Sequence, residues 1–137
     1  VLFDRPATVA GHLLDGPARR AVARQGGDFF EAVPPGGDFY LLKHILHDWS
    51  DEDALRILGS VRRAAAAGAR LLVVDAVLPG GGVPHPAVEL DIVMLMAVEG
   101  RERTAAEFEG LLSRAGFRLH RILPTGALPS VIEAVAV

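Results

Sequence analysis

The chain has 137 residues, of which 50% are hydrophobic and 23% charged, a balance that favours one packed domain over a disordered chain. The 14 Lys and Arg residues are outnumbered by 17 Asp and Glu residues, so nucleic-acid binding by phosphate neutralisation is not expected. Cysteine is absent, which excludes disulfides, and no apolar run reaches the about 18 residues that a membrane span needs.

The first half of the chain alternates short apolar runs with helical patterns, which is typical of an α/β fold. Val1–Phe3 predicts a short strand that ends at Asp4, and Ala7–Leu14 predicts a short helix after it. A second strand is predicted over Arg20–Arg24. Phe39–Ile45 is largely apolar and predicts a buried strand of a parallel sheet.

The clearest helix start in the chain is Ser50, because three acidic residues follow it at the positive end of the helix dipole. The helix is predicted to end at a C-cap on Gly68. Arg70–Leu78 then predicts the strongest strand of the chain, interrupted only by Asp75.

The sequence pattern of the last third of the chain predicts two helices followed by two strands. Val88–Val98 has a helical pattern, and Thr104 is expected to cap a second helix that runs through Arg114. Leu119–Leu123 and Ser130–Val137 alternate well enough to form a closing antiparallel pair.

Several polar side chains follow predicted strands directly, where open parallel sheets bind their ligands. Asp4 there can accept hydrogen bonds from ribose hydroxyls or cap the following helix. Asp28 and Phe29, in the run GGDFF, can place a carboxylate and an aromatic face around a purine base, or form a plain turn. Lys43 needs solvent or a charged partner, because a lone buried ammonium is costly.

Two histidines lie at the end of the predicted strand over Phe39–Ile45. His44 and His47 point to opposite faces if the strand continues through Ile45, and they converge only if a turn begins there. No third ligand at a diagnostic spacing appears, so we expect no metal. His47, just before the Ser50 cap, can act as a general base near neutral pH or bond within the loop.

Two carboxylates are candidates for partners of a histidine. Asp75 interrupts a strongly apolar strand and must find a partner, because burial of an unpaired charge is costly. Glu102 lies between two arginines ahead of Thr104, so it can serve as a second such carboxylate or form a local ion pair.

Three runs occur in the order HDWSDED, LLVVDAVLP and GRERTAAEF, and together they indicate a known protein family. The chain resembles, over essentially all of its length, the catalytic domain of plant-type and actinomycete small-molecule O-methyltransferases, which are class I S-adenosylmethionine enzymes. HDWSDE together with ERT at this separation is quite specific, whereas each run alone is weak.

The resemblance assigns roles to individual residues. It implies His47 as the catalytic base, flanked by Glu102 and by Asp75, which stands where plant members usually have Glu. The residues that it implies for binding the cofactor are Asp4, Asp28, Phe29 and Lys43. The residues that it implies for the acceptor pocket are Asp91 and Met94.

The resemblance also implies a fold and an assembly. We expect a Rossmann-like class I methyltransferase sheet with helices on both faces and a C-terminal antiparallel strand pair. Residues 1–137 would form part of such a domain, without its first strand, its glycine-rich cofactor loop or the N-terminal dimerisation domain. Two strands would then lack a neighbour. The full-length protein would be a cytoplasmic homodimer.

The function that the resemblance implies is transfer of a methyl group from S-adenosylmethionine to a hydroxyl of a small aromatic or polyketide-like acceptor. One alternative is a truncated, non-catalytic remnant or interaction domain that keeps the fold. Another is a relative that uses the cofactor for hydroxylation or decarboxylation.

Overall fold

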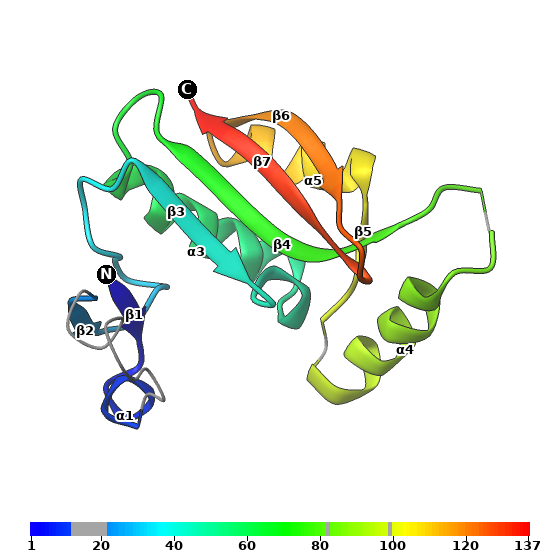
Figure 1. Cartoon of the computed structure of the whole chain (residues 1–137), viewed down its shortest axis with the longest axis horizontal. Coiled ribbons are helices and arrows are strands. Elements are labelled where there is room, and N and C mark those ends of the chain that lie inside the picture. Colours follow the sequence, from blue (N-terminus) through cyan, green and yellow to red (C-terminus); the bar gives the residue numbers. More distant parts are fainter. Residues whose placement is uncertain (12–21, 82, 99) are drawn as a thin grey trace.

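The computed structural model describes residues 1–11, 22–81, 83–98 and 100–137. Its main sheet has the strand order β3-β4-β7-β6, and a short β5 pairs with the end of β4. A separate parallel pair, β1 and β2, lies beside β3 (Figure 1). The strands are β1 (Leu2–Asp4), β2 (Arg24–Gly26), β3 (Phe39–Lys43), β4 (Arg70–Leu78), β5 (Arg103–Thr104), β6 (Phe117–Pro124) and β7 (Pro129–Ala136).

Helices α3 and α5 lie on the same face of the main sheet, whereas α4 stands beyond the end of β4 (Figure 1). The helices are α1 (Pro6–Ala10), the short 3-10 helix η1 (Leu46–Asp48), α3 (Asp51–Ala64), α4 (Pro86–Val98) and α5 (Ala105–Arg114). This order of strands and helices confirms the predicted α/β class.

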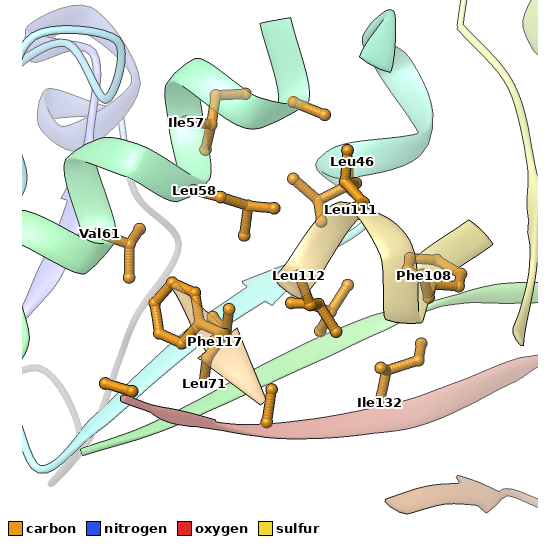
Figure 2. Packing of buried hydrophobic residues seen from close by; sticks show 14 of the residues in the cluster. Leu46, Ile57, Leu58, Val61, Leu71, Phe108, Leu111, Leu112, Phe117 and Ile132 are labelled. Atoms are coloured by element: carbon orange, nitrogen blue, oxygen red, sulfur yellow. The ribbon is translucent and has the colours of Figure 1, made fainter. Parts of the chain in front are cut away.

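The hydrophobic core fills the space between the two helices and the sheet. Figure 2 shows Ile57 and Leu58 of α3 facing Leu112 of α5 and the strand residues Leu71 and Ile132. All five side chains are fully buried. The apolar stripes of both helices therefore pack on the sheet. This packing fixes the position of β3 and β4.

The predicted start of α3 is confirmed, but its predicted end is wrong. The Ser50 hydroxyl accepts a hydrogen bond from the backbone N–H of Asp53 at 3.2 Å, as a capping residue does. The helix ends at Ala64, because Ala65 is already extended. Gly68 lies instead in the turn before β4, with φ +83°, and its N–H donates to the carbonyl of Ala136.

Two predictions in the first half of the chain need correction. The strand predicted over Arg20–Arg24 corresponds to β2, which runs over Arg24–Gly26 and pairs in parallel with β1. The helix predicted over Ala7–Leu14 is α1, which ends at Ala10. Residues 12–21 lie outside the described part of the chain.

The strand predicted over Phe39–Ile45 ends at Lys43, two residues early. His44 adopts φ +53°, which turns the chain out of the extended conformation. The chain then enters η1 in place of two further strand residues. In the rest of the chain, β4 has the predicted bounds and the predicted antiparallel pairing of β6 with β7 is confirmed. Helix α4 is also present, but it begins at Pro86, two residues before the predicted start.

Candidate active site

The turn after β3 places His47 at the carboxyl ends of β3 and β4. Its side chain lies on η1, and 8% of the residue is exposed. Because the turn begins at His44, the two histidines converge, with ring centroids 5.3 Å apart. The backbone N–H of His44 still donates to the carbonyl of Val74, so the turn stays fastened to β4.

Glu102 is the hydrogen-bond partner of His47. Nδ1 of His47 lies 2.8 Å from Oε1 of Glu102, and the carboxylate is fully buried. An ionised carboxylate only accepts, so in the neutral form of His47 the proton lies on Nδ1 and Nε2 carries the lone pair. This hydrogen bond raises the pKa of His47 against the opposing effect of burial, and the charges of Asp75 and Asp48 raise it further.

Asp75 is fully buried on β4 and does not make the predicted contact with His47. Neither of its carboxylate oxygens has a hydrogen-bond partner among the described residues. Its nearest basic atom is Nδ1 of His44, 4.0 Å from Oδ1. The Asp side chain is one methylene shorter than the Glu that the resemblance implies. Burial raises the pKa of Asp75 to about 7, although the neighbouring His47 lowers it.

The two arginines beside Glu102 do not pair with it, so the local ion pair considered from the sequence is not formed. Arg101 pairs with Glu107 and Asp51 instead. Arg103 is 1% exposed and also donates to Asp51, at 2.9 Å. Glu102 is left to face His47.

Arg103 is a positioning residue that the sequence analysis missed. Its guanidinium donates to the carbonyls of Leu46 and Trp49 at 2.7 and 2.9 Å, and so clamps η1 onto β5. The ERT run contains this arginine, but nothing in the run distinguishes a buried arginine from an exposed one.

Gly100 is a second residue that the sequence analysis missed. A Cβ on Gly100 would overlap the carbonyl oxygen of His47, and it would lie within 2.9 Å of the Asp48 backbone. The next residue, Arg101, donates its N–H to the same carbonyl at 2.9 Å. The segment that carries Glu102 therefore packs directly on the backbone of η1.

Three of the four predicted cofactor residues come together in a cleft between β1 and β3, with a volume of about 530 Å³. Asp4, Phe29 and Lys43 line this cleft, whereas Asp28 and His47 do not. Oδ1 of Asp28 accepts the N–H of Phe30 at 2.8 Å, which is the turn considered as the alternative for this residue.

The two predicted acceptor residues lie on α4. Oδ1 of Asp91 accepts the backbone N–H of Glu102 at 2.7 Å, so Asp91 links α4 to the partner of His47. Met94 is half-buried, and its carbonyl accepts the N–H of Gly100 at 3.3 Å.

A family model described as an O-methyltransferase domain matches residues 1–118. The chain belongs to this family. Phenazine O-methyltransferase PhzM of Lysobacter antibioticus is 43% identical over 137 residues, which cover 98% of this chain and 40% of that protein. The chain thus spans about two fifths of the length of the curated relatives that it matches.

Solved structures confirm the predicted methyltransferase fold. The crystal structure of LaPhzM has a TM-score of 0.93 and 40% identity, and the match covers 99% of this chain and 42% of that one. CalO1, a methyltransferase of calicheamicin biosynthesis in its SAH-bound form, has a TM-score of 0.89 and 43% identity over 99% of this chain and 41% of that one. No helix within the described ranges is long and apolar enough to cross a membrane.

Proposed function

We propose that the full-length protein transfers a methyl group from S-adenosylmethionine to a hydroxyl of a small aromatic or polyketide-like acceptor, with His47 as the general base. The observation that carries the proposal is the buried His47–Glu102 pair, in which Nδ1 of His47 lies 2.8 Å from the carboxylate and Nε2 is left to face the acceptor. The family and its O-methyltransferase relatives support it.

His47 and Glu102 would do the proton chemistry. When bound, S-adenosylmethionine supplies a methyl group whose bond electrons remain on the departing sulfur, giving S-adenosylhomocysteine. Nε2 of His47 accepts the hydroxyl proton while the acceptor oxygen bonds to the methyl carbon, so that His47 ends as an imidazolium. Glu102 stabilises that cation through the 2.8 Å hydrogen bond, which is the physical reason for the raised pKa of His47.

The cleft between β1 and β3 supports a cofactor site at the strand ends. Asp4 uses Oδ1 to accept the Arg5 N–H at 2.6 Å, which leaves Oδ2 for the ribose hydroxyls. Phe29 and Lys43 line the same cleft and supply an aromatic face and a positive charge. Asp28 would contact the adenine only through Oδ2, because Oδ1 is engaged in its own turn.

Helix α4 would form one wall of the acceptor pocket. Asp91 holds the Glu102 backbone by its 2.7 Å hydrogen bond, and Met94 lies one turn further along the helix. The same helix exposes apolar side chains, which supports the proposal that the full-length protein is a homodimer. We place it in the cytoplasm, where the resemblance puts it.

The proposal is tested by measuring methyl transfer and S-adenosylhomocysteine binding on the same variants of the full-length protein. His47→Gln removes the base but leaves the cleft intact, so turnover should fall by about 10²-fold or more while calorimetric binding stays unchanged. Asp4→Asn should weaken binding of S-adenosylhomocysteine.

His120→Gln is the matched control, because His120 is an exposed histidine on β6. Unchanged turnover in His47→Gln would remove His47 from the role of base. Consumption of an acceptor without a methylated product would instead favour hydroxylation or decarboxylation, and failure of the full-length protein to bind the cofactor would favour the non-catalytic alternative.

A further inference from the structure

His44, His47 and Asp75 converge at the ends of β3 and β4 in a way that the methyl-transfer chemistry does not require. Each offers one ligand atom, and these three atoms lie within 4.8 Å of one another. Two imidazoles and one carboxylate are a ligand set that binds Zn²⁺ and similar dications. The sequence analysis found no third ligand because Asp75 is close in space but distant in the chain.

Asp75 gives an independent indication of a ligand. Its side chain is fully buried, and both carboxylate oxygens lack a hydrogen-bond partner within the described part of the chain. The buried guanidinium of Arg103 does not serve it, because Arg103 donates to Asp51 and to the carbonyls of Leu46 and Trp49. A cation in front of Asp75 would remove the cost of this unpartnered carboxylate.

His47 is already oriented as a metal-binding histidine is. Such histidines donate the ring N–H that does not bind the metal to a carboxylate, which fixes the tautomer and increases the basicity of the other nitrogen. Glu102 accepts from Nδ1 of His47, so Nε2 is the nitrogen available to an ion. Oδ1 of Asp48 lies 3.5 Å from Nε2 and adds negative charge on that side.

His44 completes the set from the solvent side. Its φ of +53° is uncommon for a residue other than glycine, and it is this turn that brings the imidazole next to that of His47. The His44 side chain is 44% exposed, so this member of the cluster is accessible to an ion from the solvent.

We propose that His44, His47 and Asp75 bind a Zn²⁺ ion, with Nε2 of His47 and a carboxylate oxygen of Asp75 among its ligands. Ligand atoms at about 2.0–2.2 Å from a tetrahedral Zn²⁺ lie about 3.4 Å apart. The His44 nitrogen is now 4.0 Å from Asp75, and the three ligand atoms lie within 4.8 Å of one another. They therefore have to approach one another by between about 0.6 Å and about 1.4 Å.

Zinc binding would have a consequence for the proposed reaction. An ion on Nε2 occupies the lone pair that would accept the hydroxyl proton, so zinc would inhibit methyl transfer. This consequence rests on the proposed function of His47, whereas the binding of zinc does not.

The site is tested by titrating ZnCl₂ into untagged, chelator-treated full-length protein in a calorimeter. We expect one high-affinity ion per chain, and a loss of affinity of at least about tenfold in His44→Gln and in Asp75→Asn. His120→Gln should bind zinc as the parent does, because His120 lies on β6, away from the cluster. MgCl₂ should not compete, because Mg²⁺ prefers oxygen ligands.

His44→Gln is the decisive variant, because His44 is the partly exposed member of the cluster, whereas Asp75 is fully buried. Zinc affinity that is unchanged in this variant overturns the site. Co²⁺ gives a second measurement: a visible spectrum of four-coordinate cobalt that is present in the parent and lost in His44→Gln supports it. The ratio of methylation rates with and without zinc tests inhibition separately, and a ratio of one in zinc-loaded protein overturns the inhibition but not the site.

Discussion

At the scale of single residues, the position of His47 depends on the absence of a side chain at Gly100. The backbone of Gly100 packs against the His47 carbonyl, and Arg101 donates its N–H to that same oxygen. Glu102 follows two residues after the glycine and reaches Nδ1 of His47. A change at Gly100 therefore moves both members of the His47–Glu102 pair relative to each other.

Gly100→Ala is predicted to destabilise the protein, because the new Cβ would overlap the His47 carbonyl and force the two segments apart. Overpacking of this kind costs about 1–3 kcal/mol, and methyl transfer should fall as well. Urea unfolding of the full-length protein measures the first effect. Gly110→Ala is the control, since nothing lies within 4 Å of a Cβ on Gly110 in α5. Equal stability of the two variants would contradict the prediction.

The sequence predicted the identity of the central residues better than their contacts. The pairing of His47 with Glu102 followed from the resemblance and is present in the structure. The predicted hydrogen bond of Asp75 with His47 is not formed, although the two side chains have ligand atoms within 4.8 Å of each other. Arg103 was missed, because its burial results from the packing of η1 on β5, which no local pattern encodes.

At the scale of elements, the start of α5 ties the Glu102 segment to the rest of the fold. The hydroxyl of Thr104 accepts the backbone N–H of Glu107, and the Glu107 carboxylate accepts the backbone N–H of Thr104. This capping box fixes the first turn of α5 directly after β5. Arg101, which directly precedes Glu102, pairs with the same carboxylate. Glu107 therefore contacts both the start of α5 and the segment that carries Glu102.

Glu107→Gln is predicted to lower stability at neutral pH, with a difference that disappears in acid. The hydrogen bond from the Thr104 N–H, together with Arg101, lowers the pKa of Glu107 in the folded protein. Its contribution to stability is therefore complete above the ordinary pKa of about 4.5 and is lost as the pH falls through the lower folded value. Because Glu107 is partly exposed, solvent screening limits the effect to about 0.5 kcal/mol.

Thermal unfolding of the full-length protein at pH 7 and at pH 3 measures this difference between the parent and Glu107→Gln. Glu109→Gln is the matched control, because Glu109 is exposed on the same helix and outside the capping box. A difference between Glu107→Gln and the parent that persists unchanged at pH 3 would contradict the role of the ionised carboxylate.

The bounds of the helices and strands were predicted correctly where they depend on neighbouring residues and incorrectly where they depend on the rest of the fold. Thr104 and Ser50 were predicted as caps because capping depends on residues three apart in the chain. The end of β3 was placed too late, because the apolar run continues while the backbone turns at His44. The end of β2 was placed two residues early, because its residues are exposed and carry no apolar pattern, and they are held by pairing with β1.

At the scale of the whole molecule, α4 differs from the other long helices. Helices α3 and α5 bury their apolar stripes against the sheet, whereas α4 stands beyond the end of β4 (Figure 1). Its Leu95 and Met96 side chains are 67% and 82% exposed. The sequence predicted the helix from its pattern, but a largely apolar helix does not show whether its apolar side chains are buried by its own chain or by another.

The exposed side of α4 is the surface that we expect to be buried in the proposed homodimer. Leu95→Glu and Met96→Glu would place a charge in an apolar interface, so the dissociation constant of the full-length dimer should rise by more than about tenfold, or 1.4 kcal/mol. Sedimentation equilibrium of the full-length protein measures this constant. Leu123→Glu is the control, because Leu123 is an exposed leucine on β6. A dimer that withstands both α4 substitutions but dissociates in the Leu123→Glu variant would place the contact on β6 and leave α4 free to cover the acceptor.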